Sequence, residues 1–131
     1  MATVTSKLTI SSANLLSHSL NIVTTSSATA THTTGLARAP ITSTAIGTSS
    51  GQVTLYTSDD YAATAYIYIK NTNTTKTNYI YVYVDASSDT NILRLSGGEF
   101  AFLPTNGDAQ LKAYTATSGT IVEWMVFGTD Q

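Results

Sequence analysis

The sequence predicts an all-β protein, an antiparallel β-sandwich that is jelly-roll-like or immunoglobulin-like, with about eight strands. Three observations predict this fold class. Thr, Val, Ile and Tyr are abundant, and branched and aromatic side chains fit a half-buried pleated sheet. Short stretches alternate apolar with polar residues, and turn residues recur roughly every 8 to 12 positions. The chain has no run of the residues that favour helices.

The composition suits one folded domain over residues 1–131. A chain of 131 residues can bury roughly 65 to 70% of its unfolded surface without crosslinks. Charged residues make up 11% of the chain, and the formal net charge is −2 with six scattered basic residues. We therefore expect neither nucleic acid nor a membrane as partner, because both attract clustered positive charge. The absence of cysteine excludes disulfides and thiolate chemistry.

The first half of the chain begins with two predicted strands. Residues 3–10 alternate and place Val4, Leu8 and Ile10 on one face. Residues 15–24 predict the second strand, in which apolar neighbours flank His18. We interpret His18 as an interior or rim histidine whose ring is hydrogen-bonded.

Residues 24–50 contain few large apolar side chains, and we expect short strands over 28–34 and 40–46. Segments 1–12 and 24–50 also suit extended arms that lie on a neighbouring subunit, since such segments bury little by themselves. Residues 1–12 lack the continuous apolar stretch of a signal peptide, which predicts a soluble product made in the cytoplasm without its own export signal.

The centre of the chain carries two strongly alternating stretches, residues 65–70 and 78–84. In the first, Tyr66 and Tyr68 leave one face of the strand and the isoleucines leave the other. In the second, Tyr79, Tyr81 and Tyr83 alternate with aliphatic residues in the same way. We expect the two stretches to pair antiparallel, with one aliphatic wall facing the core and one cluster of tyrosines opposite.

The remaining strands are separated by turn residues. Gly97-Gly98 predicts a hairpin turn, and Pro104 is expected to end the strand over residues 99–103 that follows this turn. Asn106-Gly107 and Ser118-Gly119 predict further turns. The predicted strands are residues 53–57, 92–95, 99–103, 109–115 and 121–127.

Sites for chemistry are weakly indicated. His18 and His32 match no zinc spacing, and Asp85, Ser87, Asp89 and Asn91 begin like a calcium loop but lack its glycine and glutamate. We interpret that loop as a solvated turn and expect no metal and no cofactor.

Catalytic patterns are equally weak. Glu99 and Glu123 could form a pair of glycosidase carboxylates, although single acids on strands are usually surface residues. The chain has no nucleophile elbow and no phosphate-binding loop. We therefore expect no catalytic residues and no enzyme activity.

The tyrosine-rich face is the strongest candidate for binding. Its rings either cover the sheet, contact a protein partner or stack against a glycan, because tyrosine combines apolar area with a hydroxyl group. The candidate interaction surface consists of Tyr66, Tyr68, Tyr79, Tyr81, Tyr83 and Trp124.

From Ala65 to Phe127 the order of features resembles small structural proteins of tailed bacteriophage virions. The residues that carry the resemblance are Ile69-Lys70-Asn71-Thr72, the Tyr/Val strand, Gly98-Glu99-Phe100-Ala101-Phe102-Leu103-Pro104 and Val122-Glu123-Trp124-Met125-Val126-Phe127. This order of features is similar to the β-sandwich modules found in capsid decoration (cement) proteins and in tail or fibre accessory proteins.

The resemblance implies a virion structural protein. The first hypothesis is a decoration protein that binds the lattice of the major capsid protein. The resemblance also implies a homo-oligomer, and a trimer is favoured. Many weak contacts to a lattice add up through avidity. A tail or fibre accessory protein is the alternative within the virion. A carbohydrate-binding module that uses the tyrosine face is the alternative of another class.

Overall fold

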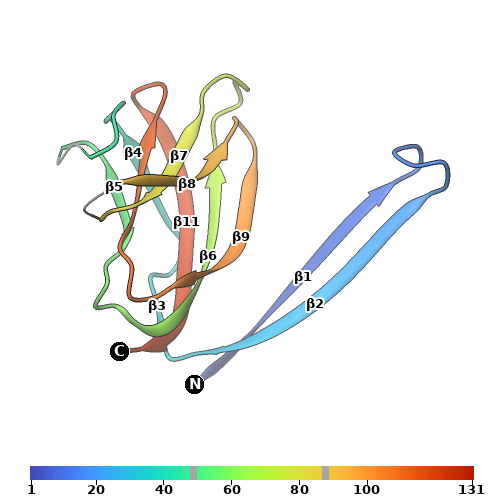
Figure 1. Ribbon diagram of the computed structural model, residues 1–131, viewed down its shortest axis with the longest axis horizontal. Coiled ribbons are helices and arrows are strands. Elements are labelled where there is room, and N and C mark those ends of the chain that lie inside the picture. The colour runs from blue at the N-terminus through green and yellow to red at the C-terminus, as the bar shows by residue number, and fades with distance from the viewer. Residues whose placement is uncertain (48–49, 87–88) are drawn as a thin grey trace. The chain divides into compact units, whose positions relative to one another are not determined.

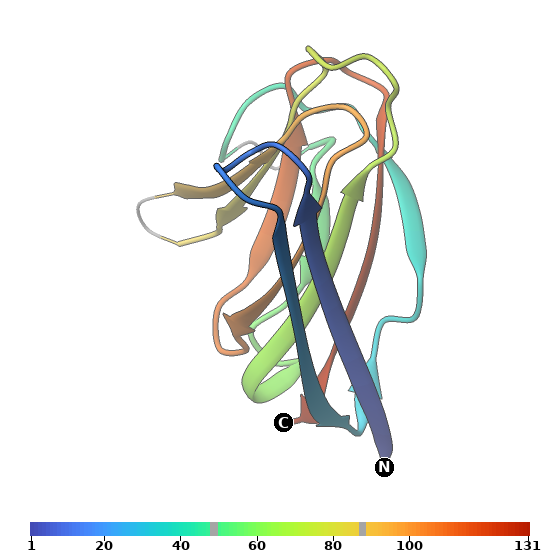
Figure 2. The same cartoon turned by 90° about the vertical axis from the view of Figure 1, so that its right-hand side faces the viewer.

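The computed structural model describes residues 1–47, 50–86 and 89–131. It confirms the all-β antiparallel sandwich, shown in Figures 1 and 2. The described residues form eleven strands, and the chain divides into two compact units, Met1–Ala30 and Thr31–Gln131. None of the described residues belongs to a helix that could cross a membrane.

The unit Thr31–Gln131 is the sandwich, and its larger sheet has five strands. Strand β11 lies at the centre of this sheet, paired with β6 on one side and with the short strands β3 and β4 on the other, while β9 pairs with β6 at the edge. The strands are β3 (His32–Thr33), β4 (Ala37–Ile41), β6 (Tyr61–Asn71), β9 (Phe100–Asn106) and β11 (Thr120–Asp130).

The second sheet has four strands in the order β5, β10, β7 and β8. All its described pairings are antiparallel, and the registers of β5 with β10 and of β7 with β8 each contain one irregularity. The strands are β5 (Val53–Tyr56), β7 (Ile80–Val84), β8 (Thr90–Leu95) and β10 (Leu111–Thr115).

The core lies between these two sheets. Alternation in each strand turns one set of side chains inward, so Ile67 and Ile69 of β6 are 1% and 0% exposed. From the other sheet, Ile80 and Val82 of β7 are buried in the same cluster. The predicted inward direction of both aliphatic rows is therefore confirmed.

Asn71 links the two sheets through hydrogen bonds inside the sandwich. It ends β6, is fully buried, and its amide nitrogen donates to the carbonyls of Asn78 at 2.6 Å and Leu95 at 3.0 Å. Its amide oxygen accepts from the backbone nitrogen of Asn73 at 3.0 Å. A buried amide with these partners fixes the position where the chain leaves one sheet for the other.

The expected pairing of residues 65–70 with 78–84 is wrong. Strand β6 pairs with β9 and β11, whereas β7 pairs with β8 and β10 in the opposite sheet. The polar link between β6 and β7 crosses from one sheet to the other, and the layers of a sandwich are about 10 Å apart, a span that eight residues cover easily. The two tyrosine rows consequently point away from each other on opposite outer faces.

The Gly97-Gly98 turn also connects the two sheets. Gly97-Gly98 does turn the chain, with Gly98 at a φ of 82° and the Glu99 nitrogen donating to the Ser96 carbonyl. The flanking strands β8 and β9 belong to different sheets, however, so the hairpin predicted there is not formed. Gly97 has no room for a side chain, because a Cβ atom would lie 2.2 Å from the Thr75 carbonyl oxygen.

The sequence predicted that Pro104 ends its strand, and this prediction is wrong. It lies within β9, opposite Tyr66 of β6. Proline lacks the N–H group that a central strand needs, but β9 is an edge strand and tolerates the loss.

The unit Met1–Ala30 is a two-stranded antiparallel ribbon. Strands β1 (Ala2–Ser12) and β2 (Leu20–Ala30) pair in continuous register over eleven residue pairs, from Ala2 opposite Ala30 to Ser12 opposite Leu20. Figures 1 and 2 show the two strands side by side along their whole length.

The ribbon changes the predicted domain boundaries. The expected single domain over 1–131 divides into two units, with the sandwich confined to Thr31–Gln131. The expected arm segment 1–12 is β1 of the ribbon, whereas of the expected arm 24–50 only residues 24–30 belong to the ribbon and the described residues from 31 onward belong to the sandwich. Residues 48 and 49 of that segment lie outside the described part of the chain.

Candidate interaction surfaces

The outer side of the five-stranded sheet carries a cluster of aromatic rings. Register places Tyr68 between Phe102 of β9 and Met125 of β11, and places Tyr66 beside Phe127. The Tyr66 ring stacks on Phe127 with centroids 5.5 Å apart and on Phe102 at 6.3 Å. We call this surface the aromatic face; it consists of Tyr66, Tyr68, Phe100, Phe102, Met125 and Phe127.

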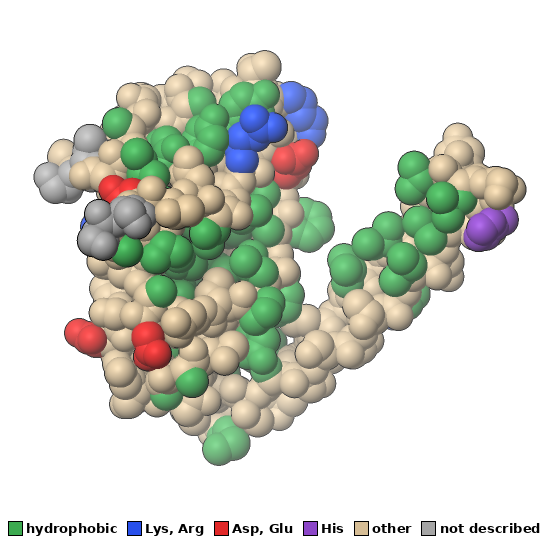
Figure 3. Space-filling view, viewed as in Figure 1, with side chains coloured by type: hydrophobic (Ala, Val, Ile, Leu, Met, Phe, Trp, Pro, Cys, Tyr) green, Lys and Arg blue, Asp and Glu red, His purple; other side chains and the backbone are tan. Residues whose placement is uncertain are grey.

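The aromatic face is open at its β9 edge. Phe100 is 62% exposed and Phe102 is 41% exposed, whereas Phe127 is buried beneath its neighbours. Figure 3 shows hydrophobic side chains gathered on the flank of the sandwich that β9 forms. Exposed aromatic rings on a sheet are a frequent feature of protein interfaces, because they bury a large area at a low cost in entropy.

Charged residues lie at one end of this face, where Arg38 of β4 forms an ion pair with Glu123 of β11. The Arg38 Nε donates to Glu123 at 2.5 Å, and the Tyr68 hydroxyl donates to the other carboxylate oxygen at 2.9 Å. Arg38 and then Tyr68 hold the pKa of Glu123 below its ordinary value, while burial and the adjacent Glu123 raise the pKa of Tyr68.

The outer side of the four-stranded sheet carries a second aromatic cluster. Tyr81 of β7 stacks on Tyr114 of β10 at 4.9 Å, and Tyr79 and Tyr83 extend the cluster along β7. The Arg94 guanidinium lies 4.7 Å from the Tyr79 ring centre, at the distance of a cation–π contact. We call Tyr79, Tyr81, Tyr83 and Tyr114 the tyrosine row.

Two of the predicted surface residues are buried. Trp124 points into the core, is 9% exposed, and its indole nitrogen donates to the Leu55 carbonyl at 3.2 Å. Tyr83 is fully buried, and its hydroxyl donates to Gln52 at 2.6 Å; burial is the main cause of its raised pKa. The structure thus corrects their expected placement on an exposed surface.

The other predicted residues fall on two separate faces. Tyr66 and Tyr68 lie half-buried on the aromatic face, and Tyr79 and Tyr81 lie half-buried in the tyrosine row. Sequence reasoning missed Phe102, Met125 and Tyr114 as members of these faces. Their alternation within predicted strands was visible, but their membership depends on which strands pair.

The ribbon has one apolar and one polar face. Directly opposed residues of an antiparallel pair share a face, so Ile10 joins Ile22, and Leu8 joins the same side. Leu8, Ile10 and Ile22 are 48%, 45% and 46% exposed. We call this side the apolar ribbon face; its nonpolar members are Ala2, Val4, Leu8, Ile10, Leu20, Ile22, Ala28 and Ala30.

The opposite ribbon face is mostly polar, and seven of its ten residues carry a hydroxyl group. Its residues are Thr3, Thr5, Lys7, Thr9, Ser11, Asn21, Val23, Thr25, Ser27 and Thr29. Residues 1–30 contain neither aspartate nor glutamate, so Lys7, His18 and the amino terminus are the ionisable groups of this unit. Figure 3 shows hydrophobic side chains along the outer half of the ribbon.

The histidines stand apart. His18 lies exposed in the loop between β1 and β2, so the interior or rim position predicted for it is wrong. His32 contacts the edge of the Tyr61 ring and lies 3.7 Å from a carboxylate oxygen of Asp130.

No metal-binding cluster of three or more His, Asp or Glu side chains occurs within residues 1–47, 50–86 and 89–131. Of the loop that begins like a calcium site, Asp85 pairs with Lys112 at 2.6 Å, and Ser87 falls outside the described residues.

The two glutamates considered as an acid pair have separate roles. Glu99 caps the Gly97-Gly98 turn, where its carboxylate accepts from the Ser96 backbone nitrogen at 2.7 Å and that bond lowers its pKa. Glu123 is held by Arg38, and its pKa is lowered as well. A glycosidase needs one carboxyl group with a raised pKa as its acid, and neither group has that property.

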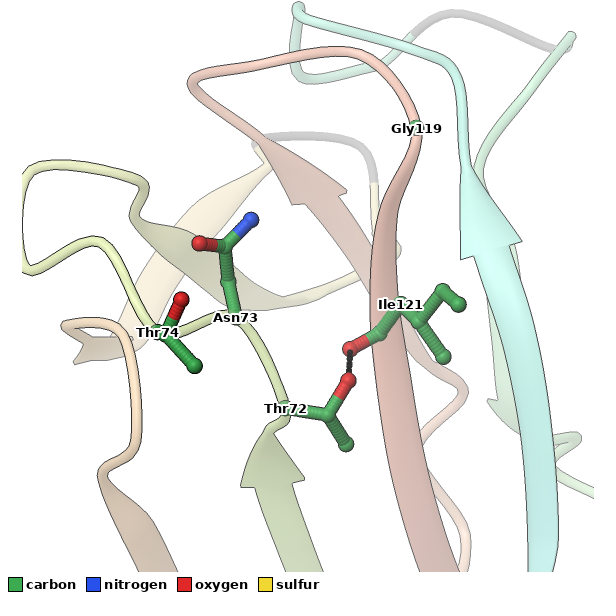
Figure 4. Close-up of a pocket in the computed structure, with 5 residues that line it drawn as sticks. All are labelled: Thr72, Asn73, Thr74, Gly119 and Ile121. Atoms are coloured by element: carbon green, nitrogen blue, oxygen red, sulfur yellow. Dashed lines mark hydrogen bonds between the residues drawn. The ribbon is translucent and has the colours of Figure 1, made fainter.

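A surface depression of about 280 Å³ lies where the β6–β7 link meets the start of β11. Figure 4 shows the Thr72 hydroxyl directed at the Ile121 carbonyl, to which it donates at 2.8 Å. Asn73 is occupied locally, since its side-chain oxygen accepts from the Thr75 nitrogen. The depression therefore gathers no set of convergent polar groups such as a small-molecule site uses.

Comparison with protein-family models, with curated proteins and with solved structures finds no match to this chain.

Proposed function

We propose that this chain is a structural protein of a bacteriophage particle, most specifically a decoration protein that binds the outside of the major capsid protein lattice. The observation that carries the proposal is the amphipathic ribbon, which presents apolar side chains that its own two strands leave about half exposed. Monomeric proteins rarely expose a continuous apolar face of this kind, whereas proteins that join an assembly bury such a face against a partner.

The sandwich adds a second feature suited to assembly. Its aromatic face presents exposed rings on a continuous sheet. The resemblance of residues 65–127 to virion proteins supports the same proposal. In it, the chain is made in the host cytoplasm, joins the particle through protein contacts, and needs no cofactor.

The test is the composition of purified particles. Quantitative mass spectrometry should find the chain in a ratio near one copy per capsid subunit or per small fixed group of subunits. A tail or fibre accessory protein would be present in far fewer copies per particle, which is the alternative within the virion. Absence of the chain from purified particles would refute both forms.

A carbohydrate-binding module is the second candidate, and the tyrosine row favours it. Tyr79 and Tyr81 are half-buried rings on an outer sheet face, and Arg94 adds a hydrogen-bond donor beside them. Sugars stack on such rings through their C–H faces. Glycan-array binding that is lost in Tyr81→Ala but kept in Tyr66→Ala would support this function, and no binding by the native chain would refute it.

A further inference from the structure

The two strands of the ribbon form a sheet of their own and do not cover its apolar face. An isolated two-stranded ribbon is marginally stable in water, and a third strand or a covering layer is needed to stabilise it. Leu8, Ile10 and Ile22 keep about half of their surface exposed, although they are the largest side chains on that face along with Leu20. A surface that packs on these side chains would stabilise the ribbon.

The aromatic face has the properties that such a surface requires. Strands β6 and β11 contain eleven residues each, the same number as β1 and β2. Two sheets of matching length pack face to face with their strands nearly aligned and their inner side chains interdigitated. Branched aliphatic side chains of the ribbon would then lie against the flat rings of Tyr66, Phe102 and Tyr68.

The charges of the two surfaces are also compatible. Lys7 lies on the polar side of the ribbon and would stay in water when the apolar ribbon face is covered. At the aromatic face, Glu123 is already paired with Arg38 and is hydrogen-bonded to Tyr68. Lys70 of β6 lies opposite both Glu123 and Phe100 on the same face, so its long side chain has to keep the ammonium group in water at the rim of the covered area.

We propose that the apolar ribbon face of one copy packs on the aromatic face of a second copy, so that the chain assembles with itself by exchanging arms. The two surfaces occur once each in every copy, so exchange among copies can cover all of them. This proposal does not depend on a role in a virion, because it concerns the purified chain in solution.

Chain length favours a second copy over the same copy as the source of the ribbon. Thr31 is held to the end of β11, where its backbone nitrogen donates to Gly128. Met125 lies three residues from Gly128, or about 10 Å along the strand, whereas Ile22 lies nine residues before Thr31, or about 30 Å away. A ribbon folded back along its own β11 would carry Ile22 beyond the aromatic rings.

The exchange joins two different surfaces, so each interface is heterologous. Such interfaces close into a ring when the rotation between copies allows it, and otherwise continue into a filament. The trimer that the resemblance to decoration proteins implies would be one closed form of this arrangement.

The first experiment measures assembly of the full chain by sedimentation velocity from about 1 to 100 µM. We expect concentration-dependent oligomers, and Ile22→Asp should weaken assembly by about tenfold or more, since one large apolar side chain is lost from the interface. Thr25→Asp, on the polar face of the same strand, is the matched control and should leave assembly unchanged.

The second set of variants leaves the ribbon intact. Phe100→Asp on the aromatic face should weaken assembly as Ile22→Asp does, because it places a charge among the rings. Ile92→Asp on β8 is its control, since Ile92 is 45% exposed but belongs to the other sheet. This pair also keeps the test valid if Ile22→Asp unfolds the ribbon.

Crosslinking tests the contact itself, and the cysteine-free chain makes it clean. A mixture of Ile22→Cys and Phe102→Cys copies should form a mixed disulfide dimer faster than a mixture of Thr25→Cys and Phe102→Cys copies. Equal rates in the two mixtures would contradict the contact.

Three results would overturn the proposal. One is a chain that stays monomeric up to 100 µM, and another is assembly that survives either Ile22→Asp or Phe100→Asp. The third is a disulfide that forms within single molecules of an Ile22→Cys, Phe102→Cys double variant at high dilution, because the ribbon would then cover its own copy. All of these measurements are made without particles, so their failure leaves the virion proposal to be judged separately.

Discussion

The ribbon and the sandwich are built from the same alternation of residues but differ in what covers the apolar side. Ile10 and Ile22 of the ribbon are 45% and 46% exposed, whereas Ile67 and Ile69 of the sandwich are 1% and 0% exposed. In the sandwich a second sheet lies across the apolar side, and in the ribbon pairing joins only two strands. Alternation therefore specifies a strand with two unlike faces, and a second layer is needed to make a core.

The two units also differ in their polar groups. The ribbon has a hydroxylic face with no carboxylate, and one side-chain hydrogen bond joins its strands, between Thr5 and Ser27 at 3.4 Å. The sandwich holds Asn71 and Glu123 in defined hydrogen-bond arrangements with several partners. We infer that side-chain hydrogen bonds specify the structure of the sandwich more fully than that of the ribbon.

The largest expected difference concerns isoleucine truncation. Ile69→Ala should lower the free energy of unfolding by about 2 to 5 kcal/mol, because it removes buried methyl groups and leaves a cavity. Ile22→Ala should change it by less than about 0.5 kcal/mol, as surface substitutions usually do. Urea unfolding at low protein concentration measures both, followed by the fluorescence of Trp124 for the sandwich and by far-ultraviolet circular dichroism for the strands of both units. Similar losses in the two variants would contradict the comparison.

Buried and exposed asparagines provide the next contrast. Asn71→Ala should cost about 1 to 3 kcal/mol, because the carbonyls of Asn78 and Leu95 lose their donor inside the sandwich. Asn21→Ala on the polar ribbon face is the matched control and should be close to neutral. The same unfolding measurement applies, and a neutral Asn71→Ala would show that the link between the sheets contributes little.

The sequence predicted the faces of strands more reliably than their partners. In residues 65–70 and 78–84 the isoleucine and valine side was correctly placed inward, because period-two alternation follows directly from strand geometry. The pairing of these two strands was predicted wrongly. Neither a polar link nor a glycine turn shows in the sequence whether the chain forms a hairpin within one sheet or crosses to the other sheet.

Trp124 shows a second limit. Val122, Trp124 and Val126 alternate with Ile121, Met125 and Phe127, so both sides of β11 are apolar and the pattern does not say which one is inside. The structure decides it through a facing layer, since Trp124 reaches across to the Leu55 carbonyl of the other sheet. The aromatic face was missed for the same reason, because its members come from β6, β9 and β11 and meet only through pairing.

Acid should act on the sandwich through Glu123. Arg38 and Tyr68 lower its pKa in the folded state, so its contribution to stability is present above the unfolded value of 4.5 and is lost as the pH falls through the lower folded value. We expect Glu123→Gln to flatten the fall in stability below about pH 5. Unfolding midpoints measured between pH 7 and pH 3 test this, and parallel curves for the two proteins would contradict it.

The smallest effect is expected from removing the ribbon. Deleting residues 2–30 should leave the unfolding midpoint of the sandwich within about 2 °C at low concentration, because the core cluster lies entirely within Thr31–Gln131. At high concentration the full chain should gain stability that the deletion variant lacks, since assembly binds the folded state and adds to its stability by mass action. A large loss in dilute solution would mean that the ribbon completes the fold, whereas equal midpoints at every concentration would argue against assembly through the ribbon.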